Sequence, residues 1–113
     1  MIQTASLLTD SGFNETKPPI KVLLESDYSK EIRIAFKKGQ FMKAPKTSFP
    51  ITVEIFDGAI NFGVNEKTHQ LKKGAIISLP ANVVHDLEAI EKSIVRLTLS
   101  KSDSIARVQK VID

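Results

Sequence analysis

Residues 74–85 read Gly-Ala-Ile-Ile-Ser-Leu-Pro-Ala-Asn-Val-Val-His, and this stretch decides the expected fold. Gly74 stands in a turn, and the apolar run that follows it has the length of a short strand. Pro80 ends that strand because it donates no backbone hydrogen bond, and Asn82 tolerates the positive φ of a tight loop. The stretch therefore predicts a strand, a tight loop and the return of the chain at His85.

Strand signals recur on both sides of this stretch. Asp57-Gly58 is a strong hairpin signal between two apolar runs. Turn residues separate runs that begin about every ten residues, a pattern typical of an antiparallel sandwich or barrel. The expected strands cover residues 21–25, 31–37, 49–56, 59–64, 68–71, 76–79, 85–90 and 93–99.

The two ends of the chain differ from this strand-rich part. Residues 1–19 contain Gly12 and the pair Pro18-Pro19, so we expect an irregular segment that wraps the domain. Residues 20–113 form the expected barrel domain. At its end, Ser102 can cap a short C-terminal helix whose apolar residues recur at helical spacing; these are Ile105, Val108 and Ile112.

The composition is that of one ordinary globular domain. The chain has 113 residues, of which 42% are hydrophobic and 26% charged. It contains no cysteine, which excludes disulfides, cysteine zinc sites and thiol nucleophiles and fits a reducing cytoplasm. We see no signal peptide and no apolar stretch near the ~20 residues of a membrane span, so we expect a cytoplasmic protein without a membrane partner.

The charge excess is concentrated in one part of the chain. The net charge is +3, and residues 37–80 hold seven lysines against Glu54, Asp57 and Glu66. A nucleic-acid-binding surface usually adds arginines and exposed aromatic residues. This chain has three arginines and no tryptophan, so we expect no nucleic-acid partner.

The spacing of four residues resembles the second motif of the cupin family, the small jelly-roll barrels. Gly74, Pro80 and His85 stand at the motif's glycine, proline and histidine positions. Asn82 stands where the family has glycine, and asparagine is the best substitute there at positive φ. Ala89 stands at the motif's last position, where the family has asparagine. The resemblance implies an all-β fold, an antiparallel jelly-roll barrel.

The first cupin motif is matched in spacing but not in its chemical residues. Gly39 and Gly58 stand at its two glycine positions. Pro45 and Thr47 occupy the two histidine positions, and Ile51 occupies the glutamate position. The resemblance implies a metal centre of three histidines and one carboxylate for members that keep these residues. Of that set this chain keeps only His85, and protein metal sites need about three or four ligands, so we expect no metal and no other cofactor.

The resemblance also places a candidate ligand pocket. It implies that His85 and Thr47 face inward, and an extended segment would put Lys43 on the same face, at the mouth of the pocket. Ile51 and Val53 form apolar walls in this interpretation. An ammonium, a hydroxyl and an imidazole among apolar walls would suit a small organic anion.

The sequence leaves three classes of function open. The first is a metal-independent module that binds a small, anionic or sugar-like molecule. The second is an enzyme, either an isomerase or epimerase that uses His85 or a degenerate relative of metal-dependent oxygenases. The third is a structural role through dimerisation, and we expect a homodimer formed through a sheet edge and the N-terminal segment because edge strands need cover.

Overall fold

The computed structural model describes residues 2–10, 12–44 and 47–101 of the chain. These residues form strands, turns and irregular segments, and none of them lies in a helix. The strands are β1 (Ile20–Glu25), β2 (Ser29–Phe36), β3 (Phe41–Ala44), β4 (Ile51–Asp57), β5 (Ala59–Val64), β6 (Lys67–Lys72), β7 (Ile76–Leu79), β8 (His85–Ala89) and β9 (Ser93–Ser100).

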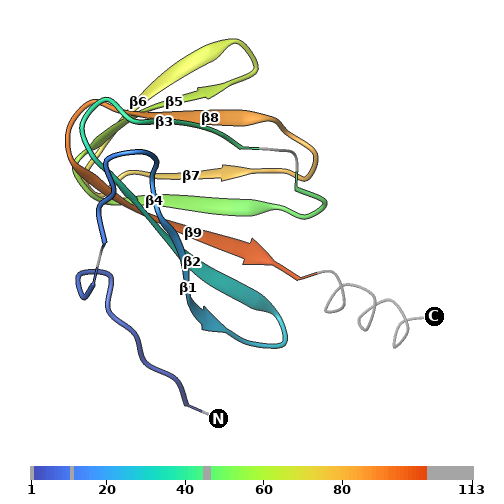
Figure 1. The fold of residues 1–113 in the computed structure, drawn as a ribbon. Coiled ribbons are helices and arrows are strands. Elements are labelled where there is room, and N and C mark those ends of the chain that lie inside the picture. Colours follow the sequence, from blue (N-terminus) through green and yellow to red (C-terminus); the bar gives the residue numbers. More distant parts are fainter. Residues whose placement is uncertain (1, 11, 45–46, 102–113) are drawn as a thin grey trace.

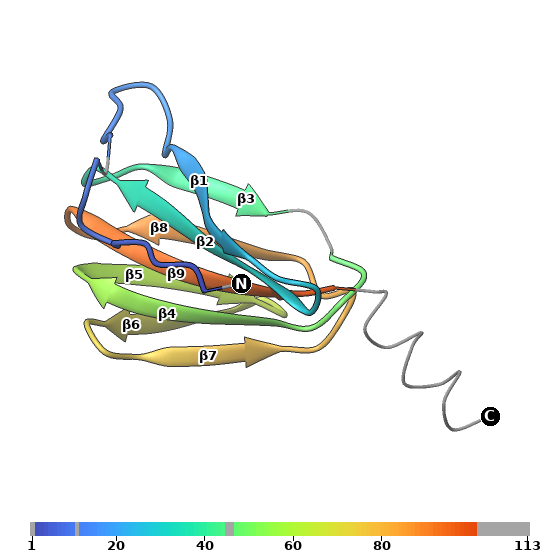
Figure 2. The ribbon, with the colours of Figure 1, turned by 90° about the horizontal axis from the view of Figure 1, so that it is seen from below.

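The strands form two antiparallel sheets that face each other (Figures 1 and 2). Sheet A has the order β1-β2-β9-β4-β7, and sheet B has the order β3-β8-β5-β6. Neighbours in each sheet are mostly distant in sequence, as with β2 and β9, which pair over the whole length of both strands. The expected all-β antiparallel class is confirmed.

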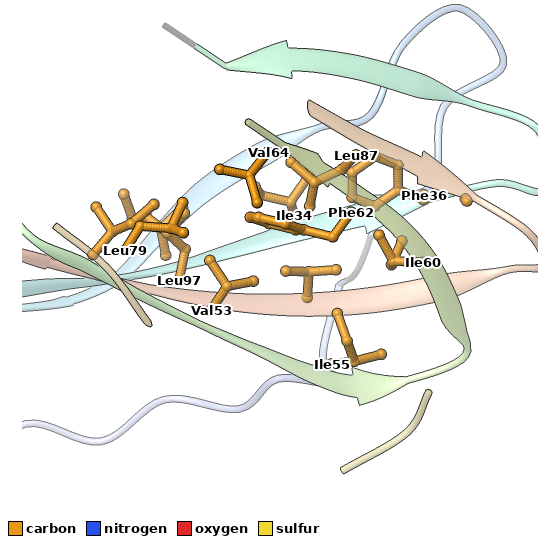
Figure 3. Packing of buried hydrophobic residues seen from close by; sticks show 14 residues of the cluster. Ile34, Phe36, Val53, Ile55, Ile60, Phe62, Val64, Leu79, Leu87 and Leu97 are labelled. Atoms are coloured by element: carbon orange, nitrogen blue, oxygen red, sulfur yellow. The ribbon is translucent and has the colours of Figure 1, made fainter. Parts of the chain in front are cut away.

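Period-2 alternation places one face of each sheet in the core. In β4, Ile51, Val53 and Ile55 are buried while the residues between them are partly exposed. Phe62 of β5 and Leu87 of β8 pack against them from sheet B, and neither side chain is more than 1% exposed. Figure 3 shows these apolar side chains filling the space between the two sheets. Their burial is the main stabilising contribution to the fold.

All eight expected strands are present, with ends that differ by at most two residues. The sequence interpretation missed β3, which has only four residues and is followed by Pro45. In β3, Met42 packs against the core and Lys43 is exposed. The expected inward orientation of Lys43 is therefore wrong, because the register of β3 against β8 puts its neighbour Met42 on the inner face.

The N-terminal segment (residues 2–10) crosses the outer face of sheet A (Figure 2). The Arg33 guanidinium of β2 donates hydrogen bonds to the carbonyl oxygens of Leu7, Thr9 and Asp10 in this segment. The first strand begins at Ile20. The expected C-terminal helix from Ser102 onward lies outside the described residues. Within the described ranges, no helix is long and apolar enough to cross a membrane.

Candidate functional site

An open cavity of about 650 Å³ lies at one end of sheet B. Its walls come from the β5–β6 turn, the β7–β8 loop and the strand residues beside them. The lining residues are Gly63, Val64, Asn65, Glu66, Lys67, Thr68, Asn82, Val83, Val84, His85 and Asp86. A cavity of this volume falls within the range of small-molecule sites.

Tight backbone geometry shapes the rim of the cavity. Asn65 and Glu66 both have positive φ, 52° and 63°, in a two-residue turn that joins β5 to β6. Such a turn matches the twist of its two strands, but a glutamate in this conformation is strained. On the opposite side Asn82 has φ 65°, as its match to a family glycine predicted. Its backbone N–H donates to the Thr47 carbonyl oxygen.

Asp86 lies on the cavity wall because Gly63 leaves room for it. The two residues are cross-strand partners in β8 and β5. A Cβ atom on Gly63 would collide with Oδ1 of Asp86 and would lie 3.0 Å from its Cγ. The Asp86 carboxylate therefore lies close over the backbone of β5. Within the described ranges this carboxylate accepts no hydrogen bond.

His85 closes the inner side of the cavity. It is 3% exposed, and its ring stacks on Phe62 with centroids 5.3 Å apart. Nδ1 lies 3.4 Å from the Val83 carbonyl oxygen. That oxygen can only accept, so Nδ1 carries the proton and Nε2 is left with a lone pair. Nε2 is buried and has no hydrogen-bond partner in the described part of the chain.

Burial lowers the pKa of His85 below its ordinary value of 6.5, because the imidazolium loses its hydration. The Val83 carbonyl and the Asp86 carboxylate act in the opposite direction but do not cancel this effect. His85 is therefore neutral at physiological pH. Its unpartnered Nε2 is an acceptor and not a charged donor.

We expect the stability of the domain to fall as the pH drops below 6.5. The unfolded chain then binds a proton on His85 that the folded chain resists, so the loss continues down to the folded pKa. His85 contributes at most about 1.4 kcal/mol per pH unit to the slope of the unfolding free energy against pH. Urea unfolding between about pH 7.5 and pH 5 measures it. The loss should be smaller in His85→Phe, which preserves the stack on Phe62.

His69 supplies the control for this measurement. It is exposed in β6, so His69→Gln should retain the pH dependence of the unmodified chain. A pH profile that is identical in His85→Phe and His69→Gln would show that the buried imidazole does not titrate as described.

Solved structures share this arrangement of strands. A match with TM-score 0.81 and 18% identity is an RmlC-like cupin protein from Desulfovibrio desulfuricans, and it covers 88% of this chain and 97% of that one. The chain has the cupin fold. A cupin superfamily protein from Desulfitobacterium hafniense matches with TM-score 0.72 and 13% identity over 79% of this chain and 82% of its own. KdgF from Halomonas sp. matches with TM-score 0.68 and 16% identity over 80% and 86%.

The expected cupin resemblance is thus confirmed at the level of the fold. A scan against family models finds no match to the sequence, and a search of curated proteins finds none either. At these identities the shared cupin fold carries no activity with it. The function must therefore be argued from the residues of the site.

The residues at the cupin metal positions do not fit a divalent cation. Ile51 has no donor atom and is 2% exposed, and the Thr47 hydroxyl donates to the Phe49 carbonyl at 2.8 Å. His85 supplies one imidazole, whereas such centres need about three or four ligands. The described residues also contain no group of three or more His, Cys, Asp or Glu side chains able to hold a metal.

The structure separates the residues that the sequence analysis grouped into one pocket. His85 lines the cavity, whereas Lys43 and Thr47 lie next to it. Lys43 is the cross-strand partner of Asp86. The Thr47 carbonyl oxygen accepts from the backbone N–H of Asn82. Ile51 and Val53 are core residues opposite Leu79 and Ile77 of β7. Among the described residues, His85 is thus the member of the group that faces the cavity directly.

Sequence patterns do not single out the carboxylates of the cavity. Asp86 follows His85 directly, and Glu66 enters the sequence argument only through the charge balance of residues 37–80. The signal available was Gly63, a glycine inside an apolar strand, which often marks a close approach of other atoms to the backbone. Which atoms approach it depends on the pairing of β5 with β8, which the sequence does not give.

Proposed function

We propose that this chain is a metal-independent module that binds a small molecule in the cavity between the β5–β6 turn and the β7–β8 loop. One observation carries the proposal. The six polar side chains of the lining besides His85 make no hydrogen bond or ion pair within the described part of the chain. These side chains belong to Asn65, Glu66, Lys67, Thr68, Asn82 and Asp86.

Two sets of less exposed polar side chains elsewhere in the fold are paired, in contrast to those of the cavity. Arg96 of sheet A bonds Glu31 and Glu54 at 2.9 and 2.8 Å. Ser93 is 1% exposed, and its hydroxyl accepts from the Ala59 backbone amide at 3.0 Å and donates to the Glu91 carbonyl at 2.7 Å. Hydrogen-bond donors and acceptors that have no partner in the protein and that surround one concave site can bind a ligand, fix its orientation and determine specificity.

A cavity-filling variant tests the proposal. Thr68 is exposed on β6 and faces Gly63 across the strand pair, so Thr68→Trp would fill the cavity. Lys72→Trp places the same side chain on the same face of β6, outside the lining. A panel of small polar molecules at about 10 mM should shift the amide resonances of residues 63–68 and 82–86. These shifts should persist in Lys72→Trp and disappear in Thr68→Trp.

Two outcomes of this titration count against the proposal. Shifts that survive in Thr68→Trp would place binding outside the cavity. A panel of sugars, polyols, carboxylates and amines that leaves all these resonances unchanged would remove the binding function itself.

The enzymatic alternative receives less support from the site. An isomerase or epimerase role requires His85 Nε2 to reach a substrate proton, and that atom is closed off from solvent. Catalysis would therefore need an opening of the rim that binding in the cavity does not need.

We further propose that the strands close into a jelly-roll barrel in the cytoplasm and that the protein is a homodimer. β1 is an edge strand, and its Ile20 and Val22 are 61% and 48% exposed although their partners in β2 are core residues. Figure 1 shows β1 on the side of sheet A far from sheet B, which explains this exposure. A register shift between Val22 and Leu24 interrupts the edge, so side-chain packing against a second copy is favoured over strand addition.

We expect Val22→Lys to shift the chain from dimer to monomer in sedimentation at tens of micromolar, roughly the range in which stable dimers persist. The introduced ammonium would be desolvated against the second copy. Tyr28→Lys is the control, because Tyr28 is 61% exposed but lies in the turn after β1. A wild-type chain that sediments as a monomer at these concentrations would contradict the proposed dimer.

A further inference from the structure

The fixed acceptor groups of the cavity restrict the chemistry of its ligand. The Asp86 carboxylate lies against the backbone of β5 because Gly63 has no side chain to displace it, and it has no donor within the described ranges. An ionised carboxylate can only accept hydrogen bonds, at about four lone-pair positions. The ligand must therefore bring donors to this part of the wall.

The other strong groups of the lining point to the same requirement. Glu66 contributes a second carboxylate at the rim, whereas the unpartnered Nε2 of His85 is buried beneath the cavity wall and takes no part in contacts with the ligand. Lys67 is the one cation among the lining residues, which are all described. The Asp86 and Glu66 carboxylates outnumber this ammonium in the lining, and Lys43, the cross-strand partner of Asp86, forms no ion pair with it in the described structure, so the lining disfavours a small anion.

The remaining lining residues complete a pattern for a neutral molecule. The Asn65 and Asn82 amides and the Thr68 hydroxyl can each donate and accept, so they suit hydroxyl groups. Val83 and Val84 add apolar surface for C–H groups, and Val84 is 42% exposed. A molecule with several hydroxyls, C–H faces and no charge satisfies all of these groups at once.

From these contacts we infer that the cavity selects an uncharged polyhydroxylated molecule, such as a monosaccharide or polyol, over small organic anions. This inference rests on the proposed binding function and replaces the organic anion that the sequence favoured. Lys43, the basis of that expectation, lies outside the lining and forms no ion pair within the described residues. Asp86 takes the central role: it accepts two hydroxyl hydrogens of the ligand.

Matched ligands test the inference. Neutral monosaccharides are titrated beside the uronic acid and the amino sugar of the same configuration, with the shifts of residues 63–68 and 82–86 as the readout. We expect the neutral sugar to bind at least about tenfold more tightly than its uronic acid. Asp86→Asn preserves the shape of the side chain but removes an acceptor, and Gly63→Ala displaces the carboxylate. Each should weaken the neutral sugar about tenfold. Gln70→Ala, on the same face of β6 as Thr68 but outside the lining, should leave its affinity unchanged.

The outcomes separate this inference from the binding function. Equal or tighter binding of the uronic acid, or tighter binding of the amino sugar, would overturn the neutral-polyol inference while preserving a binding cavity. Unchanged affinity in both Asp86→Asn and Gly63→Ala would overturn the role of Asp86. The absence of any shift with all three ligand classes would remove the binding function and this inference together.

Discussion

Replacing Gly58 by alanine should destabilise the domain by about 3–4 kcal/mol, a large share of the stability of a small protein. Gly58 forms the connection between β4 and β5 at φ +89°. A Cβ atom there would collide with the backbone carbonyl oxygen of Lys92 and lie 2.7 Å from the Cα of Ser93. Neither atom can move without shifting the chain between β8 and β9, so the turn would have to separate from it.

The environment of Ser93 increases this cost. Its hydroxyl accepts from the Ala59 amide at 3.0 Å and donates to the Glu91 carbonyl at 2.7 Å, within a residue that is 1% exposed. Moving the turn away would break the bond to Ala59 and leave a buried amide without a partner, which costs about 1–3 kcal/mol.

Gly39→Ala is the matched control, because it separates the backbone cost from the collision. Gly39 has φ +86°, nearly the value of Gly58, but no atom beyond its two chain neighbours lies within 4 Å of a Cβ placed on it. This variant should cost only the conformational penalty of about 1–2 kcal/mol. Urea unfolding of the two variants measures the difference. Equal losses would show that the Gly58 turn yields without breaking its packing.

The sequence predicted the fold well where two signals coincide. The runs at β4 and β5 alternate with period 2, and Asp57-Gly58 lies between them, so the hairpin follows from residues adjacent in the chain. The expectation that Asn82 adopts positive φ came from the spacing of a motif, and its φ is 65°. Such features depend on the conformational preferences of residues that are close together in the chain, so they can be predicted from the sequence.

The candidate site was less predictable because long-range pairing creates it. The Asp86 carboxylate can lie where it does because its cross-strand partner, 23 residues earlier in the chain, is Gly63, which has no side chain. The register of β5 against β8 brings the two residues together. Lys43 was placed on the inner face because alternation was counted from Thr47 across Pro45, whereas the register of β3 puts Met42 inward. A shift of one residue in such a count moves every side chain to the opposite face of the sheet.

Replacing Arg33 by methionine should release the N-terminal segment from sheet A and lower the stability by about 2–3 kcal/mol. Arg33 is 2% exposed, and its guanidinium donates to the carbonyls of Thr9 and Asp10 at 2.7 Å each. A longer bond of 3.4 Å reaches Leu7. Methionine retains much of the apolar length of the side chain but leaves these carbonyls without donors.

The position of Arg33 in the sheet makes these carbonyls important. Its cross-strand partners are Lys21 in β1 and Arg96 in β9, so three cations stand in one row on the outer face of sheet A. Glu31 and Glu54 bond Arg96, and no carboxylate within the described ranges bonds Arg33. Carbonyl oxygens carry partial negative charge, so the N-terminal segment supplies the acceptors that this buried cation needs.

Hydrogen exchange distinguishes release of the segment from general loss of stability. In Arg33→Met the amides of residues 5–10 should exchange faster than in the unmodified chain, and by a larger factor than the amides of β2 and β9. This follows because the segment detaches while the sheet stays paired. Lys21→Met is the control: it removes a neighbouring cation on the same outer row, but Lys21 is exposed and makes no hydrogen bond in the described structure. If exchange in residues 5–10 is unchanged in Arg33→Met, other contacts hold the segment and the role assigned to this guanidinium is wrong.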